Sequence, residues 1–241
     1  MNPGGGMILA LETSQRTSWV ALGPVLLESH CDAITSESID TQNRLVEDVL
    51  PAIQRLCARA NITRDQIGAV ALNSGPGGFS GLRIAHAAAQ SIAESLSIAI
   101  VQVSAAVVAR QSAVLAGRMD ANQIAWVALA AKNDGCWMAK VRQPSQGNDD
   151  PEHVGVRTFQ QWPVESGEIL IADEHLPVQW KERAAELNIH IVALEPTAEA
   201  VLHVARRMLA CNRTVAPQHA LPVYPREAEA VRLWRERHGT A

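Results

Sequence analysis

The chain has 241 residues, of which 47% are hydrophobic, and it carries a formal net charge of −4. This length and apolar content allow one large domain or two smaller ones, each with a real core, whereas the negative charge argues against a protein that grips nucleic acid by itself. The four cysteines are far apart and form no C-x-x-C pair, which predicts reduced thiols and neither a disulfide framework nor a zinc site: Cys31, Cys57, Cys136 and Cys211.

The first residues of the sequence do not predict a signal peptide. Residues 1–6 are rich in glycine and lack both a basic region and an apolar core, so we expect a flexible tail before a domain that starts at Met7. No apolar run in the chain approaches the roughly 20 residues that a membrane-spanning helix needs. These features predict a cytoplasmic protein without a membrane partner.

The first elements form a β-ribbon. Apolar runs at residues 7–11, 18–22 and 25–31 predict three neighbouring strands. The turn after the first run is acidic and rich in hydroxyls, with Glu12, Thr13 and Ser14 in succession. Such a turn can orient a metal-bound phosphate, although hydroxyls that cap a hairpin are the commoner case. Both interpretations stay open.

Residues 41–60 are predicted to form a helix, because apolar residues recur at spacings of three and four. The apolar arc is wider than one core-facing stripe requires, and Pro51 should kink the helix near residues 47–50. The sequence leaves open whether the whole arc is buried in its own domain or whether part of it meets a partner.

A glycine-rich loop at residues 75–83 follows a predicted buried strand at 67–72 and opens an alanine-rich helix at 80–96. Gly77 and Gly78 can adopt positive φ, so the amides of residues 77–79 can face one concavity and bind an anion at the helix N-terminus. The alternative is that the glycines let neighbouring backbones pass closely. Arg83 opposes the helix dipole, so we expect a carboxylate or an external anion to compensate for it.

The second half repeats the opening pattern. A strand at residues 124–131, a polar turn and a hairpin partner at 136–141 again precede α/β alternation, which predicts two related domains that each contain a mixed sheet. The remaining predicted elements are strands at 98–103, 169–173 and 189–193 and helices at 105–116, 178–187 and 197–210. The predicted division is a tail at 1–6, a first domain at 7–103, a second domain at 104–222 and a C-terminal segment at 223–241, expected to be a helix that packs back on the first domain.

Four motifs together resemble the TsaB (YeaZ) family, in order and over nearly the whole chain: residues 8–14, the loop at 75–84, Val103-Ser104 and residues 221–226. The resemblance implies an actin/Hsp70-like α/β fold and a non-catalytic scaffold subunit. Its implied partners are a TsaD-like transferase, which makes threonylcarbamoyladenosine on tRNA, and a TsaE-like ATPase. It implies that tRNA is met only through the complex. Separately, if the apolar helix face lies open without its partner, two copies can bury it symmetrically, so we expect a homodimer when the chain is alone.

The resemblance and the residues agree that this chain lacks catalytic, metal and cofactor sites. TsaD carries an H-x-x-x-H metal motif after the strand that corresponds to 98–103, whereas residues 104–110 here contain no metal ligand. The second-domain turn reads Ala130-Ala131-Lys132 where relatives often have Asp-Ala-Arg, and residues 41–45 lack the histidine that relatives carry there. The alternative reading is a nucleotide-binding phosphotransferase or ATPase of the same fold. A glycoprotease, the older label of this group, would need a G-x-S-x-G or H-E-x-x-H motif, and neither occurs.

Two sets of residues follow as expectations. The partner-interface candidates share an apolar helical face: Leu45, Val46, Val49, Leu50, Ile53, Ala85 and Ala89. The vestigial phosphate-loop candidates share the two turns at the ends of buried strands: Glu12, Thr13, Ser14, Gly75, Gly77, Gly78, Ser80 and Arg83.

Overall fold

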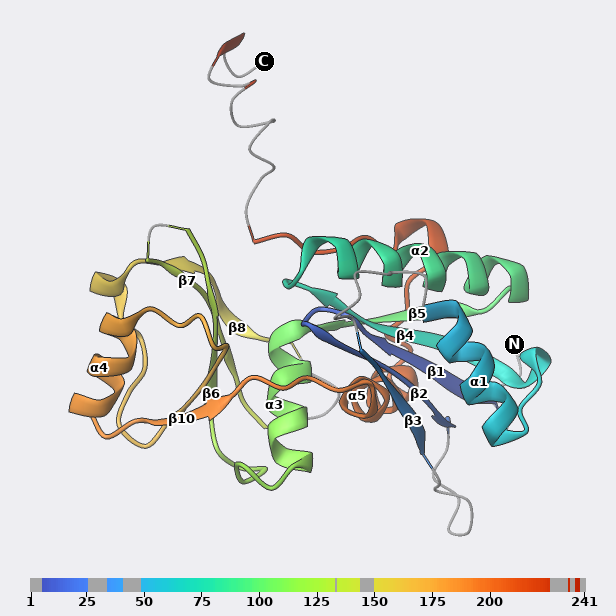
Figure 1. Cartoon of the computed structure of the whole chain (residues 1–241), viewed down its shortest axis with the longest axis horizontal. Coiled ribbons are helices and arrows are strands. Elements are labelled where there is room, and N and C mark those ends of the chain that lie inside the picture. The colour runs from blue at the N-terminus through green and yellow to red at the C-terminus, as the bar shows by residue number, and fades with distance from the viewer. Residues whose placement is uncertain are drawn as a thin grey trace.

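The protein, described by a computed structural model, contains two β-sheets with helices between them and on their outer faces (Figure 1). The structure describes residues 6–25, 34–40, 49–132, 134–143, 150–225, 234, 237 and 238. Within these residues, no helix has the length and apolar character needed to cross a membrane.

The first sheet has the strand order β3-β2-β1-β4-β5. Strands β1, β2 and β3 are antiparallel neighbours, while β4 lies parallel to β1 and β5 parallel to β4. Its central strands are apolar at almost every position, as expected for strands that are covered on both faces. The strands are β1 (Met7–Glu12), β2 (Thr17–Pro24), β3 (Thr35–Asp40), β4 (Ile67–Gly75) and β5 (Ala99–Ser104).

The second sheet repeats this topology, with the order β10-β9-β6-β7-β8. An antiparallel ribbon of β6, β7 and β8 is again followed by two parallel strands, β9 beside β6 and β10 beside β9. The predicted pair of related mixed sheets is confirmed, and the repeated topology agrees with the expected actin-like α/β fold. The strands are β6 (Ala125–Ala130), β7 (Cys136–Val141), β8 (Glu152–Arg157), β9 (Ile169–Ala172) and β10 (His190–Ala193).

Helices α3 and α5 lie between the two sheets, whereas α1 and α2 cover the outer face of the first sheet and α4 that of the second (Figure 1). The central layer is rich in alanine and valine, which lets α3 and α5 approach both sheets closely. Trp180 anchors the outer core of the second sheet and is fully buried. The helices are α1 (Val49–Ala60), α2 (Phe79–Leu96), α3 (Ala105–Leu115), α4 (Val178–Glu186) and α5 (Ala198–Ala210), with short 3-10 turns η3 (Arg64–Gln66), η4 (Phe159–Gln161) and η5 (Pro217–His219).

The chain after α5 returns to the first sheet. Val215 and Ile100 exchange two backbone hydrogen bonds, of 2.8 and 3.1 Å, and Ala220 is buried in the core beneath α1 and α2. Helix α5 itself packs against β1 and β2. The two units therefore share a layer, and the predicted domain boundaries remain a prediction.

Several predicted elements differ from the structure or lie outside its described part. The predicted third strand at 25–31 falls almost entirely outside the described residues, and the strand beside β2 is β3, in a stretch to which the sequence assigned no element. Of the helix predicted at 41–60, residues 49–60 form α1, and the predicted kink falls mostly outside the described part. Most of the predicted tail and of the C-terminal segment also lies outside it.

Candidate functional site

A cavity of about 540 Å³ lies where the turns at the carboxyl ends of the two sheets face each other. Its first wall is the β1–β2 turn, its second is the glycine loop with the start of α2, and its third comes from the second sheet. The lining residues are Thr13, Ser14, Gln15, Arg16, Ser18, Ile39, Val49, Gly77, Gly78, Phe79, Ser80, Gly81, Ile84, Leu129, Ala130 and Asp173.

Glu12, the last residue of β1, is fully buried behind this cavity, and its carboxylate is bonded within the protein. Oε1 accepts a 2.7 Å hydrogen bond from the backbone N–H of Ser14, and Oε2 accepts a 2.6 Å bond from the side-chain amide of Asn73. The same Asn73 amide nitrogen donates to Ser14 Oγ at 3.1 Å, and Asn73 Oδ1 accepts from the N–H of Gly75 at 2.8 Å. The predicted first turn and glycine loop are thus joined through Asn73, which the sequence reasoning did not include.

Burial raises the pKa of Glu12, and the hydrogen bonds from Ser14 and Asn73 offset only part of this effect. The carboxyl group therefore binds a proton more readily in the folded chain than in water. The Ser14 N–H and the Asn73 side-chain amide each bond one of its oxygens, so Glu12 links the β1–β2 turn to β4.

The glycines of the loop are required by close contact with the β1–β2 turn. A Cβ at Gly77 would lie 2.5 Å from Ser14 Cβ, and a Cβ at Gly81 would lie 2.0 Å from the carbonyl oxygen of Thr13. The N–H of Gly78 donates to the Ser14 carbonyl at 2.8 Å, and Thr13 Oγ1 donates to the Gly81 carbonyl at 2.8 Å.

This geometry favours the close-packing interpretation of the loop, because one of the three amides predicted to face an anion is already engaged with the protein. Gly77 and Gly78, which can adopt positive φ without a clash, do not use this freedom here. The loop glycine with positive φ is Gly75, at 102°. A Cβ at position 75 would also lie 2.6 Å from the carbonyl oxygen of Val223, so a residue with a side chain does not fit there. Anion binding by the loop remains a prediction.

Arg83 stacks on an aromatic ring. Its guanidinium carbon lies 4.0 Å from the centroid of the Phe79 ring, and the Phe79 ring also contacts that of Tyr224, with centroids 5.2 Å apart. The sequence reasoning anticipated a carboxylate or an external anion beside Arg83 and did not include either ring. Phe79 lies four residues before Arg83 on α2, and this spacing predicts that the two side chains touch. No local sequence pattern predicts that Tyr224 lies beside them.

Tyr224 belongs to residues 214–225, a segment that we call the C-terminal strap. Gln90 Nε2 donates to the carbonyls of Pro217 and Ala220 at 3.1 and 3.0 Å, and Gln102 Nε2 donates to that of Leu221 at 2.8 Å. The N–H of Val223 donates to the carbonyl of Ser74 at 2.7 Å. The strap is therefore fixed to α2, β5 and β4.

His86 lies beneath the strap and is buried. Its Nδ1 is 2.7 Å from the Leu82 carbonyl and its Nε2 is 3.2 Å from Gln102 Nε2, an amide donor. These partners assign the neutral tautomer with the proton on Nδ1. Burial lowers the pKa of His86, in agreement with that assignment. The residue is a structural part of the strap contact.

The second sheet contributes an acidic group to the cavity. Asp173 follows β9, and its two carboxylate oxygens accept from the backbone N–H groups of Ala130 and His175, at 3.1 and 3.0 Å. Beside it, Glu174 forms an exposed ion pair of 3.3 Å with Arg16 of the β1–β2 turn. Exposed pairs of this kind contribute little to stability, but this one joins the two units across the cavity mouth.

The predicted partner-interface residues divide into buried and exposed groups. Val49, Ile53, Ala85 and Ala89 are buried in the core of the first unit, whereas Leu50 is 54% exposed. Leu50 lines a groove of about 500 Å³ between α1 and α2, together with residues such as Ile92 and Leu96. Leu45 and Val46 lie outside the described residues.

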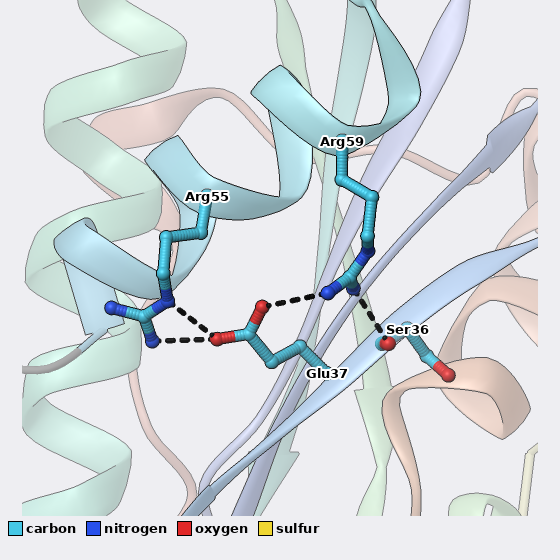
Figure 2. A network of polar contacts seen from close by, with 4 residues as sticks. All are labelled: Ser36, Glu37, Arg55 and Arg59. Carbon is cyan, nitrogen blue, oxygen red and sulfur yellow. Dashed lines mark hydrogen bonds and ion pairs between the residues drawn. The ribbon is translucent and has the colours of Figure 1, made fainter.

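Charged contacts hold α1 on the sheet (Figure 2). Glu37 on β3 accepts two hydrogen bonds from Arg55 on one carboxylate oxygen, at 2.5 and 2.8 Å, and one from Arg59 on the other, at 3.2 Å. Arg59 also donates to the backbone carbonyl of Ser36 at 2.9 Å. Because α1 is bound to the edge strand in this way, its exposed face is presented in a fixed orientation.

The start of α3 carries no metal-binding side chain. Residues 104–110 pack between the two sheets, and several of them are buried apolar residues. Within the described part of the chain, no three histidine, cysteine or acidic residues gather where they could hold a metal ion.

Comparison with known proteins gives matches along nearly the whole chain. The "tRNA threonylcarbamoyladenosine biosynthesis protein TsaB" of Escherichia coli K12 is 28% identical over 243 residues, covering 96% of this chain and 98% of that protein. The sequence profile of the family described as "TsaD: tRNA N6-adenosine threonylcarbamoyltransferase" matches residues 33–138.

Two solved structures from Pseudomonas aeruginosa have the same fold. An uncharacterised protein with similarity to the peptidase YeaZ is 26% identical, with a TM-score of 0.72, and covers 92% of this chain and 100% of its own. YeaZ is 24% identical, with a TM-score of 0.73, and covers 90% of this chain and 100% of its own.

Proposed function

The chain belongs to the TsaB (YeaZ) family, and from this premise we propose that it is the non-catalytic scaffold subunit of a complex that makes threonylcarbamoyladenosine on tRNA. Its main partner in this proposal is a TsaD-like transferase. A TsaE-like ATPase joins the complex, and tRNA is the substrate of the assembly. The proposed location is the cytoplasm, where such an assembly meets tRNA.

The observation that carries the scaffold role is the surface of the first unit. Leu50 is half exposed on a helix that Arg55 and Arg59 fix to β3, and it borders a largely apolar groove between α1 and α2. A fixed apolar helix face beside a groove suits a protein partner. A specific complex typically covers about 800 Å² on each side, so the interface would extend over both helices.

The cleft supports the non-catalytic part of the proposal. Glu12, the acidic residue at the position where a phosphate-bound metal would be oriented, is buried and engaged with Ser14 and Asn73. The Gly78 amide of the loop is engaged with Ser14 as well. These groups hold the turns together instead of facing a ligand, so we expect the isolated chain to bind ATP with Mg²⁺ weakly and not to turn it over.

The direct test is co-purification with the TsaD protein of the same organism. Leu50→Arg places a charge on the groove and should weaken the complex about 30-fold or more, the loss expected of an interface hot spot. The matched control is Leu115→Arg, which alters a leucine of similar exposure, 43%, at the end of α3. Equal affinity of the Leu50→Arg and Leu115→Arg variants for TsaD would exclude α1 from the interface.

Three further measurements test the rest of the proposal. Light scattering of the isolated chain should show a homodimer that disappears in the Leu50→Arg variant, because two copies can bury the same groove symmetrically. Calorimetry with ATP and Mg²⁺ should show no micromolar binding by the isolated chain. Tight binding together with turnover would favour a phosphotransferase or ATPase.

Mass spectrometry of tRNA nucleosides after depletion should show loss of the modified adenosine.

A further inference from the structure

A stack of one cation and two aromatic rings lies at the rim of the cavity, and its members come from distant parts of the chain. Phe79 begins α2, Arg83 follows one turn later, and Tyr224 ends the C-terminal strap. Both rings are open to solvent, with exposed fractions of 54% for Phe79 and 37% for Tyr224, and Arg83 is also exposed. We refer to these three residues as the Arg83 stack.

The chain contains only two phenylalanines and one tyrosine, and two of these three rings lie here on the surface. The other phenylalanine, Phe159, packs its ring edge-on against the fully buried Trp180. The sole tyrosine and one of the two phenylalanines instead meet on the surface. Rings that are left partly in water and aligned with a cation add little to a core, and this arrangement points to a ligand.

The Arg83 stack is held before any ligand arrives. Backbone bonding of Val223 to Ser74 fixes the residue next to Tyr224, and Gln102 holds Leu221 three positions before it. Phe79 is fixed by the first turn of α2, whose preceding loop is bonded to Ser14. A preorganised platform loses little conformational entropy on binding.

The chemistry of the stack suits an unpaired nucleotide. The Arg83 guanidinium lies over the Phe79 ring, and its N–H groups have the fork geometry that pairs with a phosphate. Aromatic rings and guanidinium planes are the surfaces on which unpaired RNA bases stack. The cavity beside the stack carries Ser80 and Gln15, whose polar groups suit a ribose.

We propose that the Arg83 stack binds one unpaired nucleotide of the RNA substrate, with the base on the aromatic platform and the phosphate on Arg83. This inference rests on the proposed function, which brings tRNA to the complex. The net charge of −4 means that the chain does not hold RNA by itself. The stack instead adds a local contact to RNA that the whole assembly binds.

The test uses the reconstituted complex and a labelled anticodon stem-loop RNA, with affinity measured by fluorescence anisotropy. Phe79→Ala should weaken RNA binding about 5- to 150-fold, the range measured for loss of stacking of one base. Phe79→Trp should retain the affinity, whereas Phe79→Leu, which keeps an apolar side chain without a π face, should lose it as Phe79→Ala does. Arg83→Gln should lower the slope of log affinity against log salt by about one.

Affinity between the scaffold and its TsaD partner, measured for the same variants, separates the outcomes. Unchanged partner binding with weakened RNA binding supports the inference. Weakened partner binding would assign the stack to the protein interface, and unchanged RNA binding in all variants would also overturn the inference. If the wild-type chain forms no complex with TsaD, the proposed function itself fails, a result that is distinct from both.

Discussion

The two sheets have the same strand order and directions, yet their polar side chains are placed differently at the strand ends that face the cavity. In the first sheet the carboxylate stands on β1 as Glu12, and the neighbouring β4 supplies Asn73. In the second sheet the residue that ends β6 is Ala130, and the carboxylate is Asp173, which follows β9. The first unit therefore has its acidic residue on the antiparallel ribbon, at the end of β1. The second unit has its acidic residue directly after the parallel strand β9.

The strand order therefore decides which strand ends lie together. The side chains at those ends decide whether the place is sealed by hydrogen bonds or open to the cavity. Glu12 is sealed behind the β1–β2 turn by Ser14 and Asn73, and the glycine loop lies against that turn. Asp173 instead lines the cavity. The first wall of the cleft is thus closed by its own hydrogen bonds, in keeping with a structural role for the turn.

The largest expected effect tests whether the two units unfold separately. Trp180→Ala empties a fully buried site on the outer side of the second sheet and should lower the free energy of unfolding by about 4 kcal/mol. Because α3 and α5 belong to a core that joins both sheets, we expect one shifted denaturation transition. The control is Val178→Ala, two residues earlier and 68% exposed, which should change stability by less than about 0.5 kcal/mol. Two separate transitions in urea would contradict the shared core.

The second prediction concerns the closed wall. Gly81→Ala forces a methyl group against the Thr13 carbonyl and should cost about 3 kcal/mol of unfolding free energy. Gly155→Ala in β8 is the matched control, since no atom lies within 4 Å of the added Cβ, and it should change stability by less than about 0.5 kcal/mol. Equal urea midpoints for the two variants would show that the loop does not lie against the turn as described.

The third prediction compares the two strand-end networks directly. Asn73→Ala removes donors from the buried Glu12 and Ser14 and should cost about 2 kcal/mol. Asp173→Ala removes an acceptor from two backbone amides in a more open site and should cost about 1 kcal/mol. Chemical denaturation measures both. A larger loss for Asp173→Ala than for Asn73→Ala would reverse the assignment of closed and open ends.

The smallest expected effect is a dependence on pH. Because the folded-state pKa of Glu12 is raised above its ordinary value of 4.5, the stabilisation linked to its neutral form is complete below that value and is lost as the pH rises through the folded pKa. The stability of the wild type relative to Glu12→Gln should therefore fall as the pH is raised from 4 upward. Thermal denaturation of both proteins across this range measures the difference. A difference that grows with pH would mean that the folded-state pKa of Glu12 is lowered and not raised.

Much of the fold was predictable because it rests on local patterns. Apolar strands that alternate with helices, and a strand-turn-strand pattern that occurs twice, indicated two related mixed sheets. Strand β3 was missed because Thr35–Asp40 is mostly polar and has only Ile39 as a buried apolar side chain, which suffices for an edge strand. The position of α5 against the first sheet was missed because amphipathic spacing shows that a face is buried and not what covers it.

The cavity walls were partly predictable for a similar reason. Turns at the carboxyl ends of parallel strands meet at one edge, which explains why the first turn and the glycine loop lie together, with Thr13 bonded to Gly81. The role of Asn73 and the contact of Phe79 with Tyr224 were not predictable. Each depends on a long-range approach set by the packing of the whole chain.

The strap has a consequence for synthesis on the ribosome. Strand β5 and helix α2 are made early, but Val215, Ala220 and Val223, which complete their surroundings, are among the last described residues of the chain. The N-terminal unit therefore emerges with part of its apolar surface uncovered and is finished only after residues 214–225 have been made. A nascent chain that stops before residue 214 leaves Ile100 without its backbone partner and His86 without its cover.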